Sequence, residues 1–248
     1  MLFALVLREM KARVGGQWVG AVWTLIEPLA HVLVMITIFS AVRGSAMPGL
    51  EYPVFLATGL VPFFLFQHLA VRLMDGIDAN KGLFAYRQVK PFDTLVSRAV
   101  VECLMNLLVY AFTLAILGWL GFHVMPASPL ELVGITLLLA LLGTSFGIFS
   151  AVVSHDRARL RSFIRISMMP LYFASGILFP IHYAPPELLQ WLLYNPLLHL
   201  IELSRHAFIP DYWTLEAVNL HYPVMFTLTL SALAMAMYRA DRLRLVTS

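Results

Sequence analysis

Charged side chains are scarce in this 248-residue sequence: 12% of its residues are Asp, Glu, Lys or Arg, whereas 60% are hydrophobic. Soluble domains carry roughly 25% charged residues, because a folded surface needs polar cover. A water-soluble fold of this length could not hide so much apolar side chain. The sequence therefore predicts an integral membrane protein, with a single transmembrane domain over residues 1–248 and short loops.

Cysteine and nucleotide-binding motifs are also lacking. Cys103 is the single cysteine, which excludes an intrachain disulfide and a cysteine-based metal site. There is no G-x-x-x-x-G-K-[ST] loop to hold ATP phosphates and no H-E-x-x-H zinc motif. Ser154-His155-Asp156 has the residue types of a hydrolase triad, but consecutive residues cannot converge as a triad does. We expect no enzyme activity, no catalytic residue and no metal site in this chain.

Long apolar runs take the place of the missing charge. A helix needs about 20 mostly apolar residues to cross a bilayer. Six segments qualify, one of them only with tilt or flanking apolar residues. They are residues 22–42, 54–71, 103–122, 132–153, 166–181 and 222–238. The predicted fold is all-α: a polytopic membrane protein with six transmembrane helices.

The apolar stretch 188–201 is too short to span and is interrupted by Asn195-Pro196. Proline removes a helical hydrogen bond and biases the residue before it away from helix. We therefore predict short re-entrant or interfacial helices between spans five and six, within residues 181–215. Broken backbone at membrane depth must be buried in protein or line a wet cavity.

The 17 Lys and Arg residues favour alternate segments outside the six predicted spans: the odd-numbered segments hold 15 of them and the even-numbered ones 2. Basic residues accumulate on the cytoplasmic side of membranes. Both chain ends are therefore predicted to be cytoplasmic. This asymmetry also accounts for the pI of about 9.1 without nucleic acid as a partner.

Residues 1–17 are predicted to form an amphipathic helix at the membrane interface. Leu2, Val6 and Met10 recur at a spacing of four residues, while Arg8 and Lys11 lie on another face. Such a helix places its apolar face in lipid and its basic side chains near lipid phosphates.

The segment 75–97 is longer than a simple connection between two spans needs to be. It combines basic side chains with the apolar Phe84 and Phe92. One interpretation is a short amphipathic helix that presents charge and a hydrophobic knob to a cytoplasmic partner. The alternative is a solvated basic loop.

Ionisable and aromatic side chains mark candidate sites within the spans. Glu27 and Glu102 lie near predicted span starts, where interfacial placement or pairing with a basic residue is expected. For His31, a packed core position and a place on a transport path both remain open. Aromatic residues such as Tyr172 and Phe173 fit either an interfacial belt or a path for sugar rings, whose C–H faces are apolar.

Several short motifs follow one another along the chain. They are LREMKAR at 7–13, GAVWTLIEP at 20–28, Lys90-Pro91, SGILFP at 175–180 and Tyr194-Asn195-Pro196. In their order and spacing they resemble the membrane subunits of ABC-2 type exporters, and among these the KpsM-like branch that exports capsular polysaccharide. The resemblance runs the length of the chain.

The resemblance implies a permease subunit of an ATP-driven exporter in the bacterial inner membrane. Its implied partners are a second copy, two ABC ATPase subunits, a periplasmic adaptor and an outer-membrane polysaccharide export protein. ATP and Mg would act on the ATPase, so this chain itself needs no cofactor. The implied cargo is a lipid-linked, acidic capsular polysaccharide, with O-antigen, a lipid or a drug as alternatives. A membrane-embedded enzyme or scaffold is a further alternative, although the spans lack buried acid–base clusters.

The resemblance also assigns roles to individual residues. Those for the channel and its substrate are Arg8, Lys11, Arg13, Trp23, Glu27, His31, Tyr172 and Phe173. Those for coupling to the ATPase, in segment 75–97, are Lys81, Phe84, Arg87, Lys90 and Phe92. A periplasmic gate would contain Tyr194, Asn195 and Pro196, with broken helices over 186–195 and 196–208.

Overall fold

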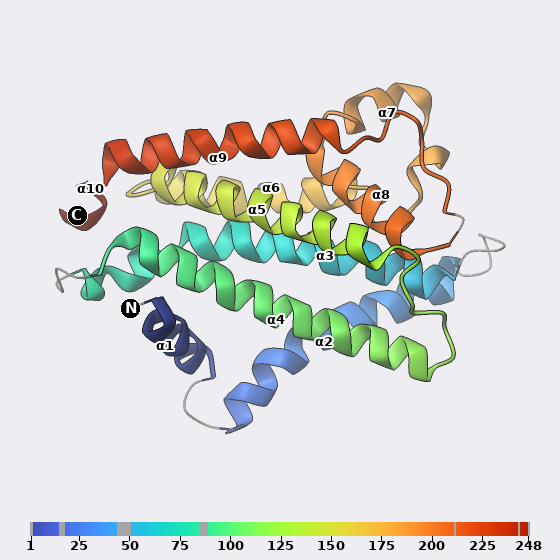
Figure 1. The fold of residues 1–248 in the computed structure, drawn as a ribbon, viewed down its shortest axis with the longest axis horizontal. Helices are drawn as coiled ribbons and strands as arrows, with labels where there is room; N and C mark the ends of the chain where they lie inside the picture. The colour runs from blue at the N-terminus through green and yellow to red at the C-terminus, as the bar shows by residue number, and fades with distance from the viewer. Residues whose placement is uncertain are drawn as a thin grey trace.

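The computed structural model of the chain describes residues 2–14, 18–43, 51–84, 89–210, 212–242 and 244–247. Within these ranges the chain forms helices and connecting turns, and no strand. The long helices run roughly side by side along one axis (Figure 1). In chain order the elements are α1 (Leu2–Val14), α2 (Trp18–Arg43), α3 (Tyr52–Met74), the 3-10 helix η2 (Asp78–Leu83), α4 (Pro91–Trp119), α5 (Pro129–Val153), α6 (Ala158–Ala174), the 3-10 helix η3 (Ile181–Tyr183), α7 (Pro186–Leu192), α8 (Pro196–Phe208), α9 (His221–Asp241) and α10 (Arg244–Thr247).

Helix α3 is the centre of the bundle. Its sequence is apolar apart from Gln67, His68 and Arg72 in its second half, which is the pattern of a helix buried on most sides. Most of its side chains are inaccessible, Phe55, Leu60 and Leu69 among them. Helices α2, α4, α5, α6 and α8 all pack against it. By contrast α4 and α5 keep exposed leucines such as Leu107 and Leu137, which suits helices that face lipid.

Two glycines allow α5 to approach α3 closely. A Cβ atom added at Gly143 would lie 3.0 Å from Leu69 Cβ, and one added at Gly147 would lie 2.6 Å from the Leu69 carbonyl oxygen. Lipid provides little hydrophobic drive between helices, so tight packing through small residues takes over. The α3–α5 contact is therefore built on the absence of side chains at these positions.

Five helices contain segments long and apolar enough to cross a membrane: α2 over Leu25–Val42, α3, α4, α5 and α9. They correspond to five of the six predicted spans. The third begins at Pro91, well before the predicted residue 103. Arg98 and Glu102 interrupt the apolar run in the sequence, but both form ion pairs with side chains of other helices. Because these ion pairs neutralise Arg98 and Glu102, α4 includes both residues, although hydropathy alone places them outside the span.

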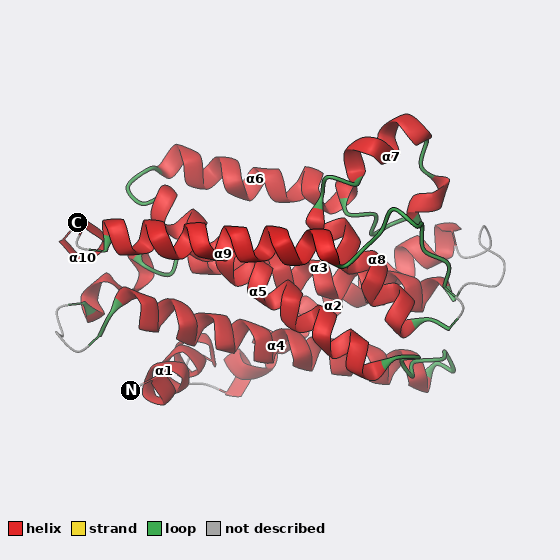
Figure 2. Cartoon of the chain, turned by 45° about the horizontal axis from the view of Figure 1, so that its top comes forward, coloured by secondary structure: helices red, strands yellow, loops and turns green. Residues whose placement is uncertain are grey.

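The predicted fifth span, 166–181, is wrong in its bounds. Helix α6 runs from Ala158 to Ala174 and is followed by a turn in which Gly176 has a φ of +66°. Arginines in the first half of α6 lower its hydropathy, so the apolar run in the sequence starts later than the helix does. In the described part of the chain, α6 is not among the five helices that are long and apolar enough to span a membrane. It nevertheless lies along α3, parallel to the other long helices (Figure 2).

The predicted break at Asn195-Pro196 is confirmed. Helix α7 ends at Leu192 and α8 begins at Pro196, and the Asn195 side chain accepts a hydrogen bond from the Leu197 amide at 3.0 Å. Helix α8 lies inside the bundle, with most of its side chains buried against α3 and α5.

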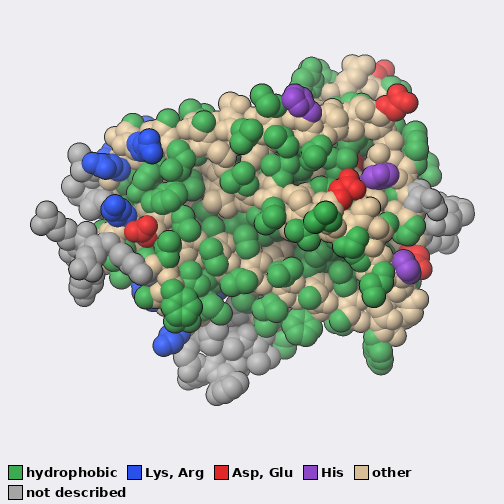
Figure 3. All heavy atoms as spheres, in the orientation of Figure 1, with side chains coloured by type: hydrophobic (Ala, Val, Ile, Leu, Met, Phe, Trp, Pro, Cys, Tyr) green, Lys and Arg blue, Asp and Glu red, His purple; other side chains and the backbone are tan. Residues whose placement is uncertain are grey.

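Both described chain ends and many basic side chains gather at one end of the bundle. Helices α1 and α10 lie together there (Figure 1), and Lys and Arg side chains cluster at the same end of the visible face (Figure 3). Most Asp, Glu and His side chains in that view lie toward the opposite end. We call these the basic end and the far end.

A candidate polar cleft toward the basic end

Four helices, α1 to α4, enclose a cleft with a volume of about 640 Å³. Each helix contributes polar side chains to its wall. Those used below are Arg13 from α1, Trp23, Glu27 and His31 from α2, Phe64, Gln67, His68 and Arg72 from α3, and Glu102 and Asn106 from α4.

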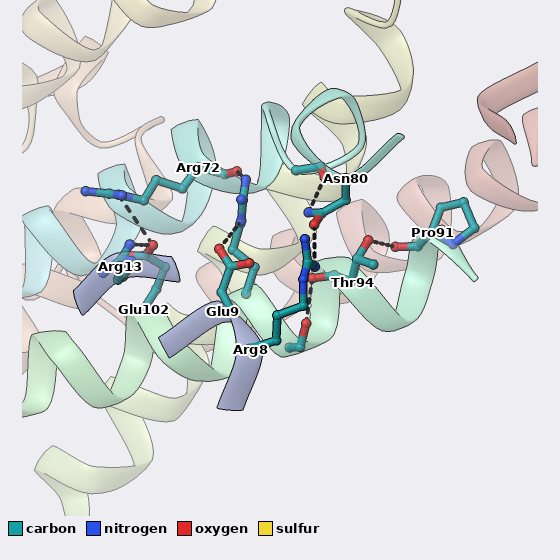
Figure 4. A network of polar contacts seen from close by, with 11 residues as sticks. Arg8, Glu9, Arg13, Arg72, Asn80, Pro91, Thr94 and Glu102 are labelled. Atoms are coloured by element: carbon teal, nitrogen blue, oxygen red, sulfur yellow. Dashed lines mark hydrogen bonds and ion pairs between the residues drawn. The ribbon is translucent and has the colours of Figure 1, made fainter. Parts of the chain in front are cut away.

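Glu102 joins α4 to two other helices at the wall of the cleft. Its side chain is 2% exposed and forms ion pairs with Arg13 and, at 3.4 Å, with Arg72 Nε. Figure 4 shows both guanidinium groups directed at this carboxylate. Burial, followed by the neighbouring Arg72, lowers the pKa of Arg13 to about 10, so Arg13 stays protonated at neutral pH. The predicted pairing of Glu102 with a basic residue is confirmed.

Two further contacts hold α1 against the bundle (Figure 4). Arg98 Nε donates to Glu9 Oε1 at 2.7 Å, and Arg8 Nη1 donates to Asn80 Oδ1 at 3.0 Å. The opposite face of α1 exposes apolar side chains, Phe3 among them. These contacts leave Leu2, Phe3 and Leu7 on the outside of the bundle, which suits a helix that lies in a membrane interface.

Three rings and one side-chain amide lie in a row across the cleft from α2 to α4. The His31 and Phe64 rings meet edge to face with centroids 5.3 Å apart, and the Phe64 and His68 rings stack at 6.0 Å. His68 Nδ1 lies 3.2 Å from Asn106 Nδ2. The cleft therefore offers aromatic faces beside hydrogen-bonding groups, which suits a ligand that has both apolar and polar faces.

Half of the residues predicted for the channel line this cleft: Arg13, Trp23, Glu27 and His31. Of the residues that complete it on α3 and α4, the sequence marked Glu102 but gave no role to Gln67, Arg72 or Asn106. A signal existed, because His68 and Arg72 are four residues apart and so lie on one face of their helix.

The other four predicted channel residues lie elsewhere. Arg8 contacts Asn80 and Lys11 is exposed on α1. On α6, the Tyr172 ring packs edge to face on Phe63 at 5.2 Å and on Phe173 at 5.4 Å, away from the cleft lining. Their roles in transport stay predictions.

The residues predicted for coupling are divided between surface and interior. Lys81 and Lys90 are exposed, and Arg87 lies outside the described residues. Phe84 is buried, and the Phe92 ring packs against another ring of the chain at 5.6 Å. The prediction that Phe84 forms a hydrophobic knob on the surface of segment 75–97 is therefore wrong, because this side chain is buried. The segment is also not one helix, because η2 and the start of α4 divide it.

Ion pairs join the start of segment 75–97 to α6. Arg165 Nη2 donates to Asp75 Oδ2 at 2.6 Å, and Arg161 pairs with both Asp75 and Asp78. Partial burial alone would raise the pKa of Asp78, but Arg161 and then Lys81 outweigh it and the pKa is lowered. These pairs link the first half of α6 to the end of α3 and the start of η2.

The predicted gate residues lie at the far end. Tyr194 is exposed, and Pro196 opens α8. Besides capping α8, the Asn195 amide donates to the Ala174 carbonyl oxygen at 3.2 Å and to Ser175 Oγ at 3.0 Å. One side chain thus ties the end of α6 to the start of α8.

Helix α8 also carries a buried ion pair that the sequence reasoning missed. Arg205 Nη1 donates to Glu202 Oε1 at 2.7 Å and to the Gly176 carbonyl oxygen at 2.8 Å. Tyr212 donates to the other oxygen of Glu202 at 3.0 Å, and burial raises the pKa of this tyrosine. The Glu-x-x-Arg spacing inside an apolar helix was the available signal.

Known proteins are similar to this chain over most of its length. The family model of the ABC-2 type transporter matches residues 1–209. The polysialic acid transport protein KpsM of Escherichia coli is 39% identical over 99% of this chain and 95% of its own length. The capsule polysaccharide export inner-membrane protein CtrC of Neisseria meningitidis is 28% identical over 84% of this chain and 78% of its own length. The O-antigen export system permease protein RfbA of Myxococcus xanthus is 26% identical over 85% of this chain and 82% of its own length.

Proposed function

Because the chain belongs to the ABC-2 type transporter family, we propose that it is the membrane-spanning permease subunit of an ATP-driven exporter that moves capsular polysaccharide across the inner membrane. The observation that carries this proposal is the 39% identity to KpsM over almost the full length of both chains. The protein is a transporter subunit and not an enzyme in its own right.

The cargo is the finer part of the proposal: a lipid-linked, acidic polysaccharide. By name, KpsM is a polysialic acid transport protein and CtrC is a capsule polysaccharide export protein, and KpsM has the highest identity of the three relatives above. O-antigen export, the function of RfbA by name, is the alternative, at 26% identity. The polar cleft with its arginines and aromatic rings supports a sugar cargo over an apolar drug.

For the topology we propose six crossings, with α6 as the fifth and both chain ends in the cytoplasm. Helix α6 has 17 residues, which is about the minimum for a span. Its arginines lie at the basic end, where their side chains can reach the membrane interface. The gathering of α1, α10 and the basic side chains at one end supports an even number of crossings.

ATP would be hydrolysed on separate subunits, and a second copy of the chain, a periplasmic adaptor and an outer-membrane export protein would complete the assembly. The exposed Lys81 and Lys90 at the basic end are the proposed contacts of the ATPase. The ion pairs that Asp75 and Asp78 form with α6 would carry its movement into the membrane.

Complementation tests the function directly. A strain that lacks this gene should lose surface polysaccharide while polymer accumulates inside, and the wild-type gene should restore export. The variant K81E/K90E should reduce export and release the ATPase during purification. R239E, exposed near the end of α9, is the matched charge reversal and should leave export unchanged. A deletion strain with unchanged surface polysaccharide would refute the proposal.

A further inference from the structure

We propose that the cleft between α1 and α4 is a subsite for an acidic sugar, with Arg72 as the residue that binds its carboxylate. This inference rests on the proposed function and adds the chemistry by which the permease would recognise its cargo. It assigns an acidic monosaccharide unit to the cleft, rather than a neutral sugar or a bare lipid phosphate.

The two arginines at Glu102 are not equivalent. Arg13 is 12% exposed and committed to the buried carboxylate, whereas Arg72 is 52% exposed although it lines the cleft. Arg72 Nε is the atom that approaches Glu102, at 3.4 Å. A guanidinium carries five N–H donors in a planar fork, so Arg72 retains donors for a second carboxylate.

Charge around the cleft also favours an anion at Arg72. Glu102 faces two guanidinium groups, which leaves an excess of positive charge at this point of the wall. Arg98, which donates to the Arg72 carbonyl oxygen at 3.1 Å, is paired with Glu9 and leaves this balance unchanged. Glu27, exposed on α2, is the other acidic group of the lining and could accept a hydrogen bond from a sugar hydroxyl.

The remaining lining fits the rest of a sugar ring. Gln67, Asn106 and His31 supply hydrogen-bond donors and acceptors for hydroxyl groups. Trp23 and Phe64 supply aromatic surface for the apolar C–H face of the ring. A lone phosphate would use only the arginine and leave these groups without a partner.

The size of the cleft agrees with this occupant. Ligand sites of about 300–1,000 Å³ hold small molecules with most of their surface covered. At about 640 Å³ the cleft has room for one or two sugar units, not for a polymer. It would therefore hold one part of the cargo at a time.

Three amphiphiles with the same dodecyl tail test the assignment: dodecyl glucuronide, dodecyl glucoside and dodecyl phosphate. Binding to the purified full-length chain in phosphatidylcholine nanodiscs is followed by tryptophan fluorescence, because Trp23 lines the cleft. We expect the wild type to bind the glucuronide about tenfold more tightly than the glucoside, as a single charge-assisted arginine contact predicts. The phosphate should bind more weakly than the glucuronide.

Arg72→Gln should remove the preference for the glucuronide, and Arg72→Lys, which keeps the charge but loses the fork, should retain part of it. Arg165→Gln is the matched control, because Arg165 is 50% exposed and likewise pairs with one carboxylate, Asp75. It should keep the full preference. The unfolding temperature of each variant shows whether it is folded.

Three results would overturn the subsite: equal binding of glucuronide and glucoside to the wild type, binding of dodecyl phosphate as tight as that of the glucuronide, or loss of the preference in both Arg72→Gln and Arg165→Gln. These results would leave the complementation outcome untouched. Conversely, a strain that exports polysaccharide without this gene would refute the proposed function whatever the probes do.

Discussion

The guanidinium carbon of Arg205 lies 3.7 Å from the centroid of the Phe55 ring, and both side chains are fully buried. The same guanidinium pairs with Glu202 and donates to the Ile177 carbonyl oxygen at 2.9 Å. An ion pair, carbonyl acceptors and an aromatic face together offset the cost of burying this charge. One side chain thus anchors α8 to α3 and to the turn after α6.

Replacing Arg205 by Met should lower the free energy of unfolding by about 3–5 kcal/mol, because Glu202 would stay buried without its partner. Thermal unfolding of the purified protein in detergent measures the change. The double variant R205M/E202L should recover part of the loss, since it leaves no lone buried charge. R239Q, at an exposed position, should match the wild type. Equal stability of R205M and R239Q would contradict the anchor.

The two glycines Gly147 and Gly134 lie on the same helix and should respond in opposite ways to alanine. At Gly147 a Cβ atom meets the Leu69 carbonyl oxygen at 2.6 Å, so the alanine variant should lose about 1–3 kcal/mol of stability. Gly134 has nothing within 4 Å of its added Cβ, and alanine there should be neutral or stabilise by up to about 1 kcal/mol. The unfolding temperatures of the two alanine variants in detergent test this difference. Similar shifts in unfolding temperature for both variants would contradict the close approach of α3 and α5.

Asn195 combines two separable functions. Asn195→Asp keeps the acceptor for the Leu197 amide but loses the donors to Ala174 and Ser175, whereas Asn195→Ala loses both. Loss of the cap alone costs about 0.5–2 kcal/mol. Stability should therefore fall in the order wild type, Asn195→Asp, Asn195→Ala. Thermal unfolding gives the ranking, and an alanine variant as stable as the aspartate would mean that the cap contributes nothing.

Reporter insertions test whether α6 crosses the membrane, as proposed for the fifth span. Insertions after Asp156 and Thr247 should report cytoplasm, and insertions after Met125 and Ala184 should report the outside. Paired alkaline phosphatase and green fluorescent protein fusions distinguish the two sides. If positions 156 and 184 report the same side, α6 does not cross.

Hydropathy located the middles of most long helices because lipid leaves few alternatives to a continuous apolar helix. It could not locate the start of α4, where Glu102 reads as a break in the sequence. In the structure Arg13 and Arg72, from two different helices, neutralise that carboxylate. Such charge pairs form between residues that are far apart in the chain. A hydropathy average over one stretch of sequence therefore cannot detect them.

Only part of the candidate cleft could be predicted, because its lining also depends on contacts between residues far apart in the chain. The α2 residues Trp23, Glu27 and His31 stood out as polar or aromatic side chains in an apolar run. Gln67 and Asn106 looked unremarkable in sequence and gain their position only from the packing of α3 and α4 against α2. Arg205 was counted only among the basic residues outside the predicted spans, whereas it is a fully buried core residue.

The emergence of α1 and α10 at the same end of the bundle has a practical use. A short flexible linker from the last residue of one copy to the first of another would stay on one side of the bilayer, so a single gene could encode a covalent tandem. Such a tandem would allow Arg72→Gln in one half alone, and its export rate would tell whether one functional half suffices.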